Sequence, residues 1–104
     1  MNYRDPRADG RVWRAAWSCS NTRGAHVYAD ADLGRKIGVM DTTYSWFVCW
    51  ASGARQPNGS TVWYYTQGDR SLDGEEELDA WGFMPSTDVP VSAHPWPGVP
   101  RCPS

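Results

Sequence analysis

The sequence predicts a single all-β domain, a small five-stranded barrel, and three observations support this fold class. Five short runs are rich in β-branched and aromatic residues, and turn-forming residues bound each of them. Ten glycines and eight prolines interrupt the chain so often that no window favours an α-helix of ordinary length. The length of 104 residues leaves room for one hydrophobic core.

The five runs define the expected strands, and the segments between them define the turns. We expect a hairpin at Asn58-Gly59, because this dipeptide favours the backbone geometry of a tight turn between two aromatic strands. Residues 67–79 hold six acidic residues against one arginine, so we expect a solvated acidic loop with one short helical turn near Glu75 to Leu78. The predicted strands are residues 25–29, 36–40, 44–51, 61–66 and 80–84.

The N-terminal segment differs in character from the rest of the chain. Residues 1–23 are expected to form a partly flexible arm, and residues 24–104 the barrel with its C-terminal tail. Trp13 and Trp17 are four residues apart, which suits a helical turn with both rings on one face. The same spacing also suits an arm that docks its two rings into a partner.

The charge and hydropathy patterns argue against several function classes. Ten basic and twelve acidic residues give a net charge of −2, which provides no broad basic face for nucleic acid. No apolar run approaches the roughly 20 residues of a membrane span. His26 and His94 are scattered, and neither they nor the cysteines have zinc-binding spacing. We therefore expect no nucleic acid, no membrane span, no metal and no cofactor.

The three cysteines indicate a disulfide-stabilised, secreted protein. We expect a disulfide between Cys49 and Cys102 that fixes the C-terminal tail to the third strand, with Cys19 left over. A pairing of Cys19 with Cys102 is the alternative. Residues 1–14 are polar and contain no apolar stretch typical of a signal peptide, so we expect a secreted protein whose leader is absent from this chain.

Three short motifs, in order, carry a resemblance to a known family. The first motif resembles an opening hairpin and consists of Val27-Tyr28 and Ile37-Gly38-Val39. The second resembles an aromatic strand and is Trp63-Tyr64-Tyr65. The third resembles a closing element and runs from Trp81 to Val89. Together they resemble a bacterial SH3-like domain over about two thirds of the chain. The wider pattern is similar to small secreted actinobacterial proteins of this class.

The resemblance implies a binding module, of which some members bind cell-wall material and others mediate protein contacts. We expect no enzyme, because no cysteine and histidine form a recognisable catalytic signature. The first hypothesis is an adaptor in a secreted multi-protein assembly, and the alternative is a module that binds peptidoglycan peptides or glycans. In both, exposed aromatic rings would make the contacts, although the same rings could instead form the core. The expected partner-binding residues are Trp13 and Trp17 of the arm and Tyr28, Trp50, Trp63, Tyr65 and Trp81 of the barrel.

Overall fold

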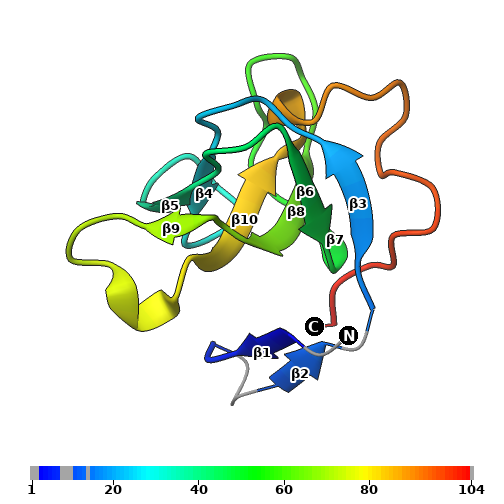
Figure 1. Ribbon diagram of the computed structural model, residues 1–104. Coiled ribbons are helices and arrows are strands. Elements are labelled where there is room, and N and C mark those ends of the chain that lie inside the picture. The colour runs from blue at the N-terminus through cyan, green and yellow to red at the C-terminus, as the bar shows by residue number, and fades with distance from the viewer. Residues whose placement is uncertain (1–2, 8–10, 14, 104) are drawn as a thin grey trace.

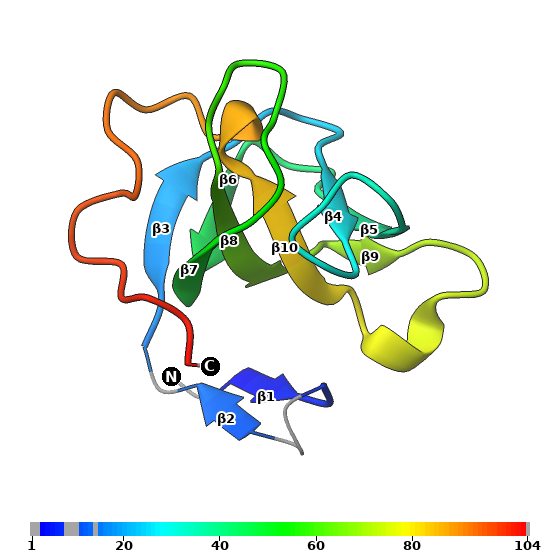
Figure 2. The same cartoon turned by 180° about the vertical axis from the view of Figure 1, so that it is seen from behind.

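The computed structural model describes residues 3–7, 11–13 and 15–103, with the side chains of residues 3, 4, 11 and 12 left out of the description. Within these residues the protein is all-β, with ten short strands, two short 3-10 helices and no α-helix (Figures 1 and 2). The elements are β1 (Tyr3–Asp5), β2 (Arg11–Trp13), β3 (Trp17–Ser20), β4 (His26–Tyr28), β5 (Lys36–Val39), β6 (Tyr44–Phe47), β7 (Cys49–Ser52), β8 (Val62–Gln67), β9 (Arg70–Ser71), η1 (Glu76–Leu78), β10 (Trp81–Pro85) and η2 (Ser86–Asp88).

The strands form three antiparallel sheets. The main sheet has six strands in the order β7-β8-β10-β4-β5-β9, and β3-β6 and β1-β2 are separate pairs. No sheet among the described residues is closed. The all-β prediction is confirmed, but the strands form an open sheet with two additional pairs where the sequence predicted a five-stranded barrel. The difference arises because the predicted strand 44–51 is divided at Val48, with β6 pairing to β3 and β7 to β8.

The other four predicted strands agree closely with β4, β5, β8 and β10. The hairpin at Asn58-Gly59 is also confirmed, since the chain turns there between the antiparallel strands β7 and β8. Gly59 has a φ of 89°, which a glycine adopts without strain, and the Asn58 side chain accepts a hydrogen bond of 2.9 Å from the Ser60 backbone.

The main sheet has different clusters on its two faces, because side chains alternate along each strand. On β8, Tyr64 lies in the main core, whereas its neighbour Tyr65 belongs to a second hydrophobic cluster. The main core also contains Val27, Ile37 and Phe47. The two clusters share no buried residue, so the molecule has one principal core and a smaller aromatic cluster beside it.

The C-terminal tail follows η2 and passes β3 on its way to the main sheet (Figures 1 and 2). The predicted disulfide between Cys49 and Cys102 is confirmed, with an S–S distance of 2.04 Å, and Cys19 is buried and free. Trp50 donates its backbone N–H to Pro100 and accepts a hydrogen bond from Cys102. The tail is therefore bound to β7 both covalently and through its backbone.

The predicted N-terminal arm is folded over its described residues. β1 and β2 form a hairpin, and β3 pairs with β6. Trp13 and Trp17 consequently lie on two separate strands, so the helical turn predicted for this segment is wrong. The physical reason is that the two rings are buried in different places: Trp17 packs on the main core and Trp13 on the aromatic cluster.

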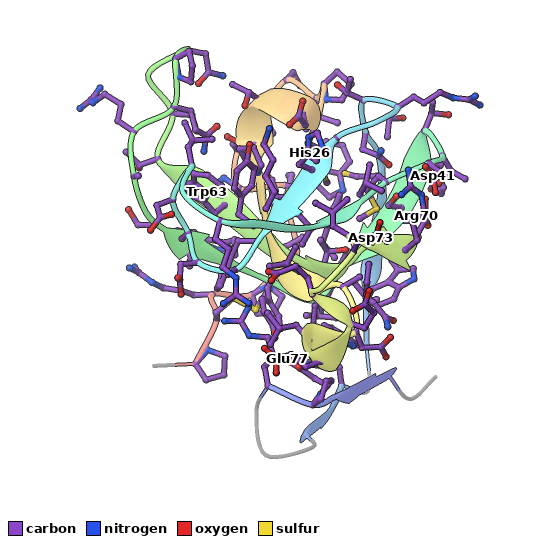
Figure 3. All side chains as sticks on the ribbon, turned by 90° about the vertical axis from the view of Figure 1, so that its left-hand side faces the viewer. His26, Asp41, Trp63, Arg70, Asp73 and Glu77 are labelled. Atoms are coloured by element: carbon purple, nitrogen blue, oxygen red, sulfur yellow. A yellow bond between two sulfur atoms is a disulfide. The ribbon has the colours of Figure 1, made fainter. Side chains whose placement is uncertain are left out.

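The acidic segment 67–79 is more ordered than a solvated loop. Asp69 accepts hydrogen bonds of 2.7 and 3.0 Å from the backbone of Asp41 and Thr42. Asp41 in turn forms an ion pair of 2.9 Å with Arg70, and the two side chains point toward one another in Figure 3. The helical turn expected near Glu75 is confirmed as η1. In the described part of the chain no three metal-binding side chains converge, and no helix is long and apolar enough to cross a membrane.

Candidate functional site

The candidate site is a group of five aromatic rings on the second cluster, which we call the aromatic cluster. At its centre, Tyr65 of β8 and Trp81 of β10 are buried with their ring centroids 5.7 Å apart. Three half-buried rings surround them: Trp46 lies 5.5 Å from Trp81, and Phe83 and Trp13 lie 5.0 and 6.0 Å from Tyr65. These distances are typical of favourable aromatic pairs.

Strand alternation explains why these rings share one face. Trp81 and Phe83 are two residues apart on β10, and the register of the sheet places Phe83 opposite Tyr65. Gly82, between them, allows β4 to approach, because a side chain there would collide with the backbone oxygen of Tyr28. The Gly in the sequence Trp-Gly-Phe is therefore required for the packing that presents the two rings.

The β1-β2 hairpin packs against the aromatic cluster through Trp13 and Arg7, and buried Asp5 bonds to both of these residues. The Asp5 carboxylate has no exposed surface, and it accepts hydrogen bonds from the Arg7 backbone at 2.9 Å and the Trp13 indole at 3.2 Å. The Arg7 guanidinium donates to the backbone oxygen of Trp81 at 3.1 Å. The hairpin thus contacts the main sheet at Tyr65 and Trp81, the two central residues of the cluster.

Burial and the acceptor Asp5 control the ionisation of Tyr65. Burial, first, and then the hydrogen bond to Asp5 hold the pKa of the Tyr65 hydroxyl far above its usual range. Tyr65 therefore stays protonated to a higher pH than an exposed tyrosine does.

The indole of Trp81 provides a second donor in the same cluster. Trp81 has no exposed surface, and its Nε1 finds no hydrogen-bond acceptor among the described residues. Buried indole N–H groups usually have a partner, since an unsatisfied buried donor costs about 1–3 kcal/mol. The aromatic cluster thus contains a satisfied indole donor in Trp13, which bonds to Asp5, and an unsatisfied one in Trp81.

The structure brings together only three of the seven predicted partner-binding residues: Trp13, Tyr65 and Trp81. Tyr28 and Trp63 are both buried and form a perpendicular pair with centroids 5.7 Å apart. A ring with no exposed surface cannot stack on a ligand, so Trp63 and Trp81 act as core residues in this conformation.

Trp17 and Trp50 lie on the other side of the main sheet, half-buried against the main core. The Trp50 ring carries the Arg101 guanidinium 5.0 Å from its centroid, within the range of a cation–π contact. The ring of Trp17 lies beside Gly98 of the tail. Both tryptophans therefore help to hold the tail and are separated from the aromatic cluster.

Sequence reasoning missed Trp46, Phe83 and Asp5. The alternation Tyr44-Ser45-Trp46-Phe47 could have indicated Trp46, because it predicts Trp46 and Tyr44 on the face opposite buried Phe47. Tyr44 on that face is 65% exposed. On the neighbouring strand β3, Ser18 lies opposite Trp46 and Ser20 lies opposite Tyr44. Nothing in the sequence singled out Asp5 from the other charged residues of the N-terminal segment.

A comparison of the chain with protein-family models, with curated proteins and with solved structures finds no match.

Proposed function

We propose that the protein is a non-catalytic binding module that serves as an adaptor or docking subunit in a secreted multi-protein assembly. One observation carries the proposal: Trp13, Trp46 and Phe83 gather as half-buried rings around Tyr65 and Trp81. Clustered aromatic side chains that are only partly covered are typical of the energetic centre of a protein interface. The N-terminal hairpin is part of this contact surface.

The disulfide supports an extracellular location. A bond between Cys49 and Cys102 is consistent with an oxidising compartment, where small domains use disulfides to supplement a limited core. The assignment to a bacterial SH3-like domain of small secreted actinobacterial proteins rests on the three sequence motifs alone. That family assignment is part of the proposal.

The ionisable groups near the main core favour binding over catalysis. Burial raises the pKa of the Cys19 thiol, so this cysteine stays in the protonated, weakly nucleophilic form. Burial raises the pKa of Tyr64 to about 12 and lowers the pKa of His94. His94 Nδ1 lies 2.6 Å from the Tyr64 hydroxyl, and this hydroxyl accepts a hydrogen bond from the Trp96 backbone. These contacts hold the tail in place.

The alternative function, binding of cell-wall peptide or glycan, is favoured by the outer face of β3-β6. Tyr44 is exposed, and it shares this face with Trp46 and with two serines. Exposed flat rings beside small hydroxyl side chains suit stacking on a sugar. This surface lies next to the aromatic cluster, since Trp46 belongs to both.

Two matched substitutions separate the adaptor function from the cell-wall alternative. Tagged full-length chain is incubated with culture supernatant and, separately, with purified peptidoglycan. The adaptor function predicts that a discrete protein is captured in near-stoichiometric amount, that Phe83→Ala reduces its capture at least tenfold, and that Tyr44→Ala does not. The alternative would be supported if the wild-type chain sediments with peptidoglycan, Tyr44→Ala abolishes this sedimentation, and no protein is captured. If the chain captures no protein and also fails to sediment with peptidoglycan, both functions are contradicted.

A further inference from the structure

We propose that Asn58, in the turn between β7 and β8, is a modification site at which the side-chain amide is hydrolysed to an acid, and that the native turn restrains this reaction. The products are aspartate and isoaspartate, and the only co-reactant is water. Gln56 is the positioning residue that keeps the reaction slow. The inference concerns the β7-β8 turn and is independent of the proposed function.

Asn58 and Gly59 form the reactive pair. The backbone nitrogen of Gly59 loses its proton to a base and attacks Cγ of Asn58. The bond from Cγ to Nδ2 then breaks, and Nδ2 takes up a proton and leaves as ammonia. Water opens the resulting five-membered imide at either of its two carbonyl carbons, which gives aspartate or isoaspartate. Gly59 has no side chain to obstruct the attack, and both residues are exposed to solvent.

The two other asparagines of the sequence lack this combination. Asn2 precedes Tyr3 and Asn21 precedes Thr22, so each is followed by a residue with a side chain. Asn21 is also only 3% exposed, and its Nδ2 donates hydrogen bonds of 2.9 and 2.8 Å to two backbone oxygens. Sequence and exposure therefore both favour the reaction at Asn58.

Hydrogen bonds hold the reacting groups in the native turn. The N–H of Gly59 donates to the backbone oxygen of Gln56 at 2.8 Å, so the proton that the reaction must remove is already bonded. The Oδ1 of Asn58 accepts a hydrogen bond of 2.9 Å from the N–H of Ser60, which fixes the side-chain amide. The attack therefore requires a local opening of the turn that breaks these bonds.

The side chain of Gln56 fastens the turn to the body of the protein. Gln56 is 2% exposed, and its Nε2 donates to the backbone oxygen of Val62 at 2.7 Å. Its Oε1 accepts hydrogen bonds of 3.2 and 3.0 Å from the Ser86 hydroxyl and the Thr87 backbone, and Figures 1 and 2 both show the β7-β8 loop beside η2. Breaking the bonds of a buried amide is costly, so Gln56 makes the opening rare and slows the reaction at Asn58.

Incubation of the full-length protein at mildly alkaline pH tests the restraint by the fold. Mass spectrometry of proteolytic peptides measures the fraction of chains in which Asn58 has become acidic. Anion exchange measures the negative charge that each event adds to the net charge of −2. We expect the wild-type chain unfolded in guanidinium chloride, with its disulfide intact, to react at least about tenfold faster than the native protein.

Matched glutamine variants test the role of Gln56. Folded Gln56→Ala should react at least about threefold faster than folded wild type, because the turn opens more often. Hydrogen exchange at the Gly59 amide should accelerate by the same factor, since the same bond to the Gln56 backbone opens in both processes. Gln67→Ala is the control, because the Gln67 side chain bonds to Asp79, and it should react at the wild-type rate.

Several results would overturn the inference. Native wild-type protein that reacts as fast as the unfolded chain would show that the turn imposes no restraint. Folded Gln56→Ala that reacts at the wild-type rate, or Gln67→Ala that accelerates equally, would reject Gln56 as the positioning residue. A new charge that maps to another residue would reject the site. If Gln56→Ala does not fold, Ser86→Ala replaces it, because it removes only the hydroxyl that contacts Gln56 and Ser60, and it should accelerate the reaction measurably.

Discussion

The two ends of the chain both pack against the main sheet, but they do so by different means. The C-terminal tail is joined to β7 by the disulfide Cys49–Cys102 and by backbone hydrogen bonds of 2.9 and 2.7 Å with Trp50. The N-terminal hairpin has no such ladder among the described residues and is held by side chains, chiefly Trp13 on Tyr65 and Arg7 on the backbone of Trp81.

The difference indicates different roles for the two segments. The tail packs Val99 and Trp96 on the main core, so its displacement would open the principal hydrophobic core of the protein. The hairpin packs on the second cluster, which also contains Cys49 and Cys102, so the disulfide of the tail lies in the same cluster. The tail is therefore a structural element of the main core, whereas the hairpin is held mainly by side chains and belongs to the contact surface that we propose.

The largest expected effect comes from removing the bond that fixes the tail. Cys102→Ser opens a loop with a sequence separation of 53, and in the chain-entropy model it should lower the free energy of unfolding by about 4 kcal/mol. Denaturant titration without reductant measures the loss. Cys19→Ala is the matched control, because it removes only one buried sulfur and should cost about 1 kcal/mol. Equal losses in the two variants would contradict a special role for the disulfide.

The next largest effect should distinguish the two N-terminal tryptophans. Trp17→Ala removes a ring from the main core and should cost about 3 kcal/mol in the free energy of unfolding. Trp13→Ala removes a ring from the aromatic cluster and releases the hairpin, so we expect a smaller loss of about 1 kcal/mol. Thermal and denaturant unfolding measure both. A loss for Trp13→Ala as large as that for Trp17→Ala would show that the hairpin belongs to the core.

The smallest effect concerns the pH dependence of the tail. Burial lowers the pKa of His94, so the unfolded chain takes up a proton before the folded protein does. The contribution of His94 to stability is therefore fully present above the unfolded pKa of about 6.5 and decreases as the pH falls through it. His94→Gln should have a shallower decrease of the unfolding midpoint between about pH 7 and pH 5 than wild type. An unchanged slope would contradict this assignment.

Local sequence signals were sufficient for several parts of the fold. The runs that became β4, β5, β8 and β10 combine β-branched and aromatic residues with flanking turn formers, so short-range chemistry determines them. The turn at Asn58-Gly59 was predictable because its backbone geometry requires those residues. The disulfide was predictable from the need to fix a tail that carries Cys102.

The remaining features depend on tertiary contacts that no local pattern shows. β1 and β2 are charged and only three residues long, and their hairpin packs through Trp13 against Tyr65, a residue distant in the sequence. The sequence did not reveal the break at Val48, because an uninterrupted aromatic run favours one strand. In the structure the two halves of this run pair with different strands, β6 with β3 and β7 with β8. Composition also could not tell which rings are buried, and Trp63 and Trp81 proved to be core.

Native-state hydrogen exchange of the wild-type protein tests the contrast between the two ends most directly. We predict that amides of β1 and β2 exchange through a local opening of low free energy, because the hairpin can leave while the main core stays packed. The amides of Trp50 and Cys102, which are bonded to Pro100 and Trp50, should exchange only with global unfolding. Exchange of the hairpin amides at the global rate would contradict the weaker attachment of the hairpin to the main sheet.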